Sequence, residues 1–151
     1  MKFLAAVTLP LLLALSRPAL AQDSGPWRAA DSTAKTITGD IEIANGRLLI
    51  NFAGFPLAQI RALKPAEASG AFDADPSTPG GGNLYRLQVP ADKRFQHHNT
   101  LCGGEQTQWM ATWASGSELQ VAFFSGQNMP VLTLDALNGS SAGCGVYRYV
   151  R

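Results

Sequence analysis

The stretch Asp40-Ile41-Glu42-Ile43-Ala44-Asn45-Gly46-Arg47-Leu48-Leu49-Ile50 decides the fold class. Asn-Gly is the preferred pair for a two-residue type I′ turn between antiparallel strands, because both turn residues need a positive φ. A turn at this pair sets a register that places apolar residues on one face. The pairs on that face are Ile43/Leu48, Ile41/Ile50 and Gly39/Phe52. Turn chemistry and side-chain alternation agree, so the sequence predicts a β-hairpin.

Alternation of apolar and polar residues indicates further strands along the chain. The Trp109–Trp113 spacing also suits a helix, but the turn at Ser115-Gly116-Ser117 and the alternation that follows favour a second hairpin. Strands are expected at 55–63, 84–89, 107–114, 118–124, 131–134 and 145–150. The segments 65–83, 92–106 and 136–143 are predicted to be loops, the first with a short helical turn at its start.

About eight short strands with frequent turns and no long helix predict an all-β fold, a small antiparallel barrel or sandwich. A barrel-like closed sheet is the preferred version. In a barrel, the terminal strand can pair with the first hairpin, and this pairing removes an exposed sheet edge.

The first 21 residues are typical of a cleaved export signal. Lys2 precedes an apolar stretch, and Ala19-Leu20-Ala21 fits the small-x-small cleavage rule, so Gln22 becomes the first mature residue. The alternative, a membrane anchor, needs about 20 uninterrupted apolar residues. Pro10 interrupts the run here. We therefore expect a periplasmic or secreted protein without stable membrane insertion, with a flexible lead-in over 22–35 and one β-rich domain over 36–151.

Composition and charge exclude several classes of protein. The chain has 151 residues, of which 46% are hydrophobic, and this suits one domain with its own core. Its 12 basic residues and 11 acidic residues nearly cancel. A nucleic-acid binder built on a basic face is therefore not expected.

The two cysteines, Cys102 and Cys144, are predicted to form a disulfide, because an even cysteine count in an exported protein favours one. The alternative is a redox or metal site. No Cys-x-x-Cys motif is present, and the glycine-rich flanks carry no group that would lower a thiol pKa. His97 and His98 lie close to Cys102 in the sequence, which keeps metal binding by these histidines as an alternative.

Candidate catalytic groups are few. His97 and His98 are the only histidines, and no Gly-x-Ser-x-Gly motif occurs, so a nucleophile–base pair is not evident. Asp40 and Glu42 share the polar face of the first hairpin, where a solvated surface is the simpler interpretation than a catalytic pair. The Asp73–Asp75 spacing resembles the start of a calcium loop but lacks its Gly and its distal Glu.

The aromatic residues offer a candidate binding surface. Trp109, Trp113, Phe123 and Phe124 lie on two neighbouring predicted strands, and Phe123 and Phe124 face opposite ways. Part of this set belongs to the core. The rest, with Trp109, Trp113 and Phe124 as candidates, would form an exposed apolar patch of the kind that contacts partners. Core packing is the competing interpretation for the same residues.

Several segments resemble a group of small exported bacterial β-rich proteins of unknown function. They are the start of the first hairpin at 37–41, Leu101-Cys102-Gly103, the run Phe123-Phe124-Ser125-Gly126, and Cys144 with Tyr147. In size and expected fold the chain is also similar to periplasmic lysozyme inhibitors of the β-barrel type. The resemblance implies a periplasmic location and leaves the activity open, and no inhibitory residue is carried over.

Together these observations predict a non-catalytic binding or inhibitor-type protein that recognises a protein or an envelope component. No cofactor and no nucleic-acid partner are expected. The contact elements are expected in the loops 65–83, with Asp73 and Asp75, and 92–106. A metal or small-ligand carrier using His97 and His98 is the first alternative, and a secreted hydrolase is the second.

Overall fold

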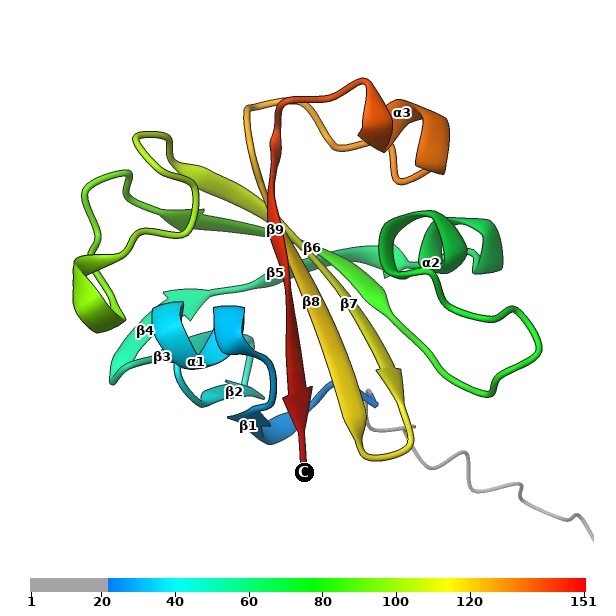
Figure 1. Cartoon of the computed structure of the whole chain (residues 1–151), viewed down its shortest axis with the longest axis horizontal. Helices are drawn as coiled ribbons and strands as arrows, with labels where there is room; N and C mark the ends of the chain where they lie inside the picture. The colour runs from blue at the N-terminus through cyan, green and yellow to red at the C-terminus, as the bar shows by residue number, and fades with distance from the viewer. Residues whose placement is uncertain (1–21) are drawn as a thin grey trace, which may run out of the picture.

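The computed structural model describes residues 22–151, and the export signal expected at residues 1–21 lies outside this range. Nine strands form one antiparallel sheet in the order β4-β3-β2-β1-β9-β8-β7-β6-β5 (Figure 1). The strands are β1 (Gly25–Ala29), β2 (Ile41–Ala44), β3 (Arg47–Ile50), β4 (Ala53–Pro56), β5 (Ala58–Ala62), β6 (Asn83–Val89), β7 (Thr107–Ser115), β8 (Glu118–Ser125) and β9 (Gly143–Val150). The predicted all-β class is confirmed.

The first hairpin forms with the predicted turn and register as far as Ile50. Asn45 and Gly46 take φ values of 53° and 69°, and Ile43 pairs with Leu48. The apolar face of β2 and β3 is buried and the other face is partly exposed. The hairpin ends at Ile50, because the chain turns again there to start β4. The predicted pair Gly39/Phe52 is therefore wrong.

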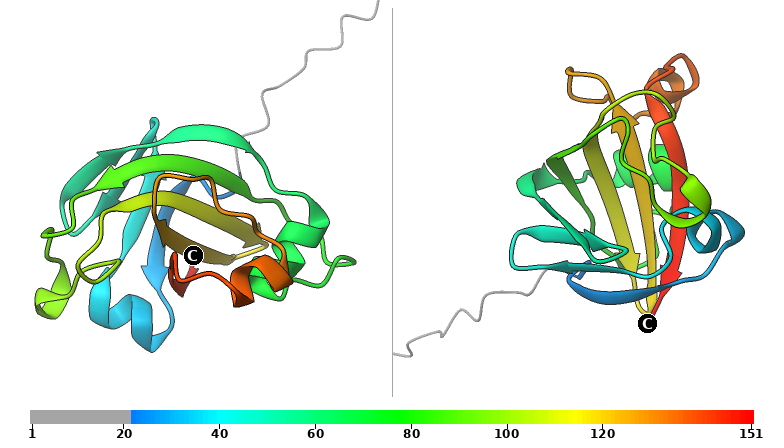
Figure 2. Two further views of the ribbon diagram at one scale, coloured as in Figure 1. Left: turned by 90° about the horizontal axis from the view of Figure 1, so that it is seen from above. Right: turned by 90° about the vertical axis from the view of Figure 1, so that its left-hand side faces the viewer.

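The sheet is curled but not closed. Its edge strands β4 and β5 follow each other in the chain, joined by Leu57 alone, yet β4 pairs with β3 and β5 pairs with β6. The sheet bends around one face (Figure 2), so neither a closed barrel nor a two-sheet sandwich describes it fully. This change of partner at Leu57 explains why the segment 55–63 shows poor alternation.

The segment expected to be a flexible lead-in is part of the fold. Strand β1 lies between β2 and β9, so β9 pairs with β1. The expected pairing of the terminal strand with the first hairpin is therefore wrong. Burial of Trp27, which is 1% exposed, stabilises this arrangement. Helix α1 (Ser32–Ile37) follows, and the Asp31 side chain caps it by accepting from the Ala34 amide at 2.8 Å.

The main core fills the inner face of the curled sheet. It includes Leu48, Met110, Phe123 and Tyr147, all of them fully buried, which come from four different strands. The predicted disulfide is confirmed: Cys102, in the loop before β7, is bonded to Cys144 at the start of β9 with the Cα atoms 4.9 Å apart. The bond ties the last strand to the loop that precedes the second hairpin.

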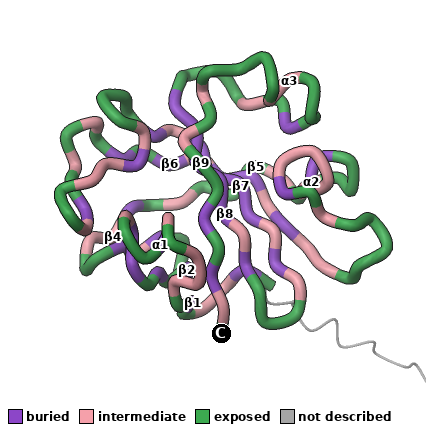
Figure 3. The backbone as a smooth tube through the Cα atoms, in the orientation of Figure 1, coloured by how far each residue is buried: buried purple, intermediate pink, exposed green. Residues whose placement is uncertain are grey.

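A smaller second core covers part of the outer face, and the central strands β7 and β8 are therefore largely buried on both faces (Figure 3). Helices α2 (Pro65–Phe72) and α3 (Leu134–Asn138) lie over it. The expected strand at 131–134 does not form: Leu132 is buried in this second core and Leu134 begins α3. The expected loop 65–83 begins with the whole of α2, where a short helical turn was expected, and the expected loop 136–143 contains the end of α3.

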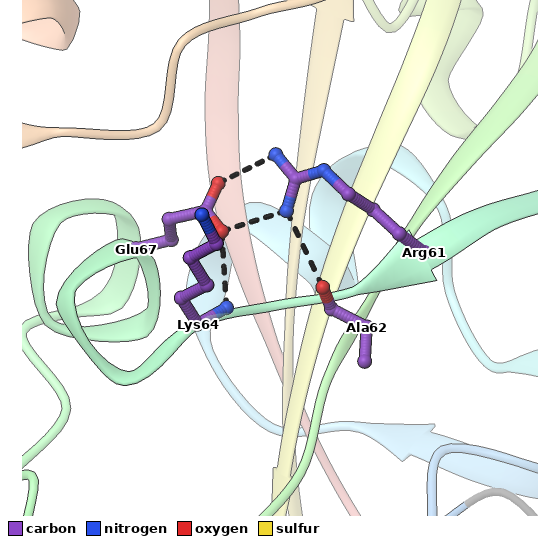
Figure 4. A network of polar contacts seen from close by, with 4 residues as sticks. All are labelled: Arg61, Ala62, Lys64 and Glu67. Carbon is purple, nitrogen blue, oxygen red and sulfur yellow. Dashed lines mark hydrogen bonds and ion pairs between the residues drawn. The ribbon is translucent and has the colours of Figure 1, made fainter.

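Helix α2 is attached to the edge strand β5 by an ion pair (Figure 4). The Arg61 guanidinium donates to both carboxylate oxygens of Glu67, at 2.6 and 2.7 Å, and the Lys64 amide donates to the same carboxylate at 3.0 Å. These hydrogen bonds hold the pKa of Glu67 below its usual range, with Arg61 as the main cause. The paired charges place α2 against the sheet.

The run Gly80-Gly81-Gly82 serves close backbone packing. Gly81 forms two backbone hydrogen bonds with Ala114 of β7. The Gly81 amide donates to the Ala114 carbonyl oxygen at 2.9 Å, and the Ala114 amide donates to the Gly81 carbonyl oxygen at 2.8 Å. A Cβ atom on Gly82 would collide with the Thr112 carbonyl oxygen. Glycine is therefore required here by the approach of the loop to β7.

Candidate functional site

The turn between β3 and β4 presents an aromatic side chain to solvent. Asn51 and Phe52 join the paired residues Ile50 and Ala53 as a second two-residue turn, with φ values of 48° and 66°. The Phe52 side chain is 102% exposed, the highest value among the exposed large apolar residues. Burial of an aromatic ring is strongly favourable, so an isolated and fully exposed Phe is a notable feature of this surface.

The backbone at Phe52 is strained as well. The left-handed region costs an L-residue about 1–2 kcal/mol. The preceding hairpin has the same turn geometry but places Gly46 at the equivalent position, where this cost is absent. Backbone strain of this kind concentrates at functional sites. Phe52 thus combines a conformational cost with a side chain that makes no contribution to the core.

A hollow of about 530 Å³ lies beside this turn. It is formed where β1, β2, β3 and the end of β9 meet, at the end of the molecule that carries the C-terminus (Figure 1). Its apolar lining includes Trp27, Ile41, Leu49, Phe52 and Val150. The volume is in the range that accommodates a small molecule or several side chains of a partner.

Arg151 fixes one wall of the first hollow. Its guanidinium lies 4.2 Å from the centre of the Trp27 ring, a cation–π geometry. The same group donates to the carbonyl oxygens of Ser24 at 2.8 Å and Gln22 at 3.2 Å. The C-terminal residue thereby holds the start of the described chain, and its side chain is ordered by three contacts.

Charges of both signs surround the first hollow. Asp40 and Glu42 line it from β2 and the residue before it, and Arg28 and Arg151 line it from β1 and the C-terminus. Asp40 is held in place because its carboxylate accepts from the Ala29 amide at 2.9 Å. The polar lining of the hollow is therefore mixed in charge.

A second hollow of about 590 Å³ adjoins the first. Asp40, Asn51 and Phe52 line both hollows, while Lys35 and Gln96 contribute only to the second. The Phe52 turn therefore stands between two depressions. We call this surface, made of the turn and both hollows, the Phe52 face.

The aromatic residues predicted to form an exposed patch lie in the second core. Trp109 and Phe124 are 7% and 4% exposed, and Trp113 is half-buried beside them. The Trp109 indole donates to the Gly126 carbonyl at 3.1 Å, and the Arg86 guanidinium stacks 4.6 Å from its ring centre. Of the two interpretations of these residues, the structure supports core packing.

Asp73 and Asp75 shape the backbone of the loop after α2. Asp73 ends the helix in a left-handed conformation with a φ of 53°. The Asp75 carboxylate accepts from the amide and the hydroxyl of Ser77, and these hydrogen bonds lower the pKa of Asp75. Both residues have a local structural role, and neither lines the Phe52 face.

His97 and His98 lie on an exposed 3₁₀ turn, η1 (Gln96–His98), within the loop 92–106. Both have positive φ values, 52° and 62°. Within residues 22–151 no three His, Cys, Asp or Glu side chains gather into a set that could hold a metal ion. Both cysteines are joined to each other, so they do not complete a ligand set with these histidines.

No protein-family model matches the chain, and no curated protein or solved structure was found to be similar to it. Over residues 22–151, every helix falls short of the length and apolar character that a membrane-crossing helix requires. The site is therefore argued from its own geometry.

Phe52 is the residue that the sequence reasoning missed, because the alternation of the first hairpin had placed it on the buried face opposite Gly39. One signal could have indicated its position. Asn51 is a residue type that tolerates a left-handed backbone, and the Asn-x pair repeats the start of the turn at Asn45.

Proposed function

We propose that this chain is a non-catalytic binding protein of the periplasm or extracellular space, and that it recognises another protein through the Phe52 face. One observation carries the proposal: a fully exposed Phe in a strained conformation stands between two hollows. Protein interfaces obtain most of their binding energy from a few residues, often aromatic ones that enter a pocket of the partner. Phe52 has the position and chemistry of such a residue.

The disulfide supports a location outside the cytoplasm. Cys102 and Cys144 are bonded, and disulfides persist in oxidising compartments. The sequence of residues 1–21 has the features of an export signal and agrees with this location. Both observations bear on where the protein works and are independent of the Phe52 face.

Charge favours a protein as the partner. Anionic lipids and nucleic acids are bound by clusters of Lys and Arg. The first hollow is instead lined by two acidic residues, Asp40 and Glu42, and by two basic residues, Arg28 and Arg151. A partner that suits it has a pocket for one phenyl ring, an apolar segment for the first hollow, and charges of both signs around them.

The test is affinity capture from an envelope extract with wild-type protein and with Phe52→Gly, followed by titration of the purified partner. Glycine keeps the turn, since its backbone adopts a positive φ freely. Loss of a central aromatic contact is expected to weaken the measured Kd about 30-fold or more. Val131→Ala is the matched control, because Val131 is 63% exposed. It belongs to the segment that joins β8 to α3, and this segment lies at the opposite end of the molecule from the C-terminus (Figure 1).

An equal effect of both substitutions, or no effect of either, would overturn the assignment of the Phe52 face. Binding of the wild type to anionic vesicles without any protein partner would overturn the choice of a protein. Zinc binding that requires His97 and His98 would support the carrier alternative in its place.

A further inference from the structure

Asp23 is a buried carboxylate at the start of the described chain. The residue is 1% exposed. Its Oδ2 atom accepts from the Tyr85 hydroxyl at 2.8 Å, the Thr112 hydroxyl at 2.5 Å and the Asn83 side-chain amide at 3.2 Å. Its Oδ1 atom is also buried, and within residues 22–151 it has no hydrogen-bond partner. Oδ2 thus accepts three hydrogen bonds, and Oδ1 accepts none from residues 22–151.

The charge of this carboxylate has no counterpart among its contacts. Tyr85, Thr112 and Asn83 are all neutral donors. The ion pair found among residues 22–151 joins Arg61 to Glu67 and does not involve Asp23. A buried carboxylate normally acquires a cation or gives up its charge, because an unpaired charge away from water is costly.

A cation arises one residue away when the export signal is removed. Hydrolysis of the Ala21–Gln22 bond by a signal peptidase consumes one water molecule and leaves a carboxylate on Ala21 and an amino group on Gln22. This amino group takes up a proton at neutral pH, because its ordinary pKa is about 7.7–8.0. The new ammonium belongs to the residue directly before Asp23.

The backbone next to Asp23 is already held in place. Arg151 donates to the Gln22 and Ser24 carbonyl oxygens, and the Trp27 indole donates to the Asp23 carbonyl oxygen at 2.9 Å. These contacts tie residues 22–24 to β1 and to the C-terminus. The backbone that carries the N-terminal group is therefore ordered, and a contact between this group and the carboxylate would cost little further conformational freedom.

We propose that export processing completes this site: the α-ammonium of Gln22 donates a hydrogen bond to Oδ1 of Asp23 and neutralises the buried carboxylate. The inference rests on cleavage after Ala21 and is independent of the proposed binding function. It also makes Gln22 slow to cyclise, because cyclisation needs the free amine to attack the side-chain amide and release ammonia. Removal of the export signal and neutralisation of the buried charge become one event.

The test uses residues 22–151, which contain the whole described fold, with Gln22→Ala to prevent cyclisation. This form is compared with one that retains Ala21, which moves the ammonium by about 3.8 Å. Both forms are made with Asp23 and with Asp23→Asn. The extra residue is expected to lower Tm by about 4 °C with Asp23 and to have no effect with Asp23→Asn.

NMR titration of the α-amine provides a second measurement on the Asp23 protein alone. Pairing with the carboxylate is expected to raise the pKa of the amine by about one unit above its ordinary value. An ordinary amine pKa, or an equal loss of Tm in both backgrounds, would overturn the proposal. So would N-terminal sequencing of the exported protein that finds a first residue other than Gln22. If Asp23→Asn does not fold, the amine pKa decides.

Discussion

Replacing Phe52 with glycine should make the protein more stable while removing its proposed binding. The Phe52 side chain is 102% exposed, so its removal uncovers no core surface. Relief of the left-handed φ of 66° is worth about 1–2 kcal/mol. The greater freedom of glycine in the unfolded chain offsets about 0.5–1 kcal/mol of this gain. The net gain is about 1 kcal/mol, or about 4 °C in Tm for a domain of this size.

Two further variants separate backbone strain from loss of the side chain. Phe52→Ala removes the ring but keeps the strain, so its free energy of unfolding should stay within about 0.5 kcal/mol of wild type. Gly46→Ala introduces the same strain at the equivalent turn position, where a Cβ atom would lie 3.9 Å from its nearest neighbour and has room. It should lose about 1 kcal/mol.

The assay is thermal and urea unfolding of all three variants, combined with partner titration for the Phe52 variants. A fall in Tm on Phe52→Gly would refute the reasoning, because it would mean that the ring supports the fold. Equal stability of Phe52→Gly and Phe52→Ala would show that the turn is not strained. Both outcomes would remove the physical argument for a functional role.

Three other predictions follow from buried groups and covalent links. Tyr147→Phe should leave stability unchanged or raise it, because the Tyr147 hydroxyl is buried without a partner among residues 22–151. Tyr149→Phe should instead lower the free energy of unfolding by about 1 kcal/mol, because it removes the 2.7 Å hydrogen bond to the Thr38 hydroxyl. Urea titration distinguishes the two variants. Reducing the Cys102–Cys144 bond, which spans 42 positions, should cost about 4 kcal/mol, measured by unfolding with and without dithiothreitol. The hydrogen bonds that lower the pKa of Glu67 stabilise the fold at pH values above the ordinary pKa of Glu, and this stabilisation is lost as the pH falls through the lowered pKa. Glu67→Gln should therefore make the free energy of unfolding less dependent on pH below about pH 4.3.

Local patterns predicted the strands that have one consistent set of neighbours. Residues 84–89 alternate because β6 keeps one face on the main core, and Tyr85, Leu87 and Val89 are all buried. Segment 55–63 was harder to interpret, because it changes partner at Leu57 and its two halves belong to different strands. Periodicity reports the faces of one strand and cannot show where a strand bends into another.

The candidate site was the least predictable part. Alternation extends through Phe52 as though the hairpin continued, and nothing local prevents that continuation. The hairpin ends at Ile50 because Ala53–Pro56 forms its own pairs with β3, and this leaves Phe52 in the turn. The helices α2 and α3 were equally hidden, since both are short and packing against the outer face stabilises them more than their own sequence does.

By itself the sequence determined the features that depend on neighbouring residues: the Asn45-Gly46 turn, the alternation of β2 and β3, and the pairing of the only two cysteines. Only the tertiary structure decided that β1 lies between β2 and β9, and that Phe52 and Asp23 end in opposite environments. Local conformational preferences are encoded within a few residues. Strand order, burial and the surroundings of the Asp23 carboxylate depend on contacts between distant segments. These contacts exist only once the sheet has curled around its core.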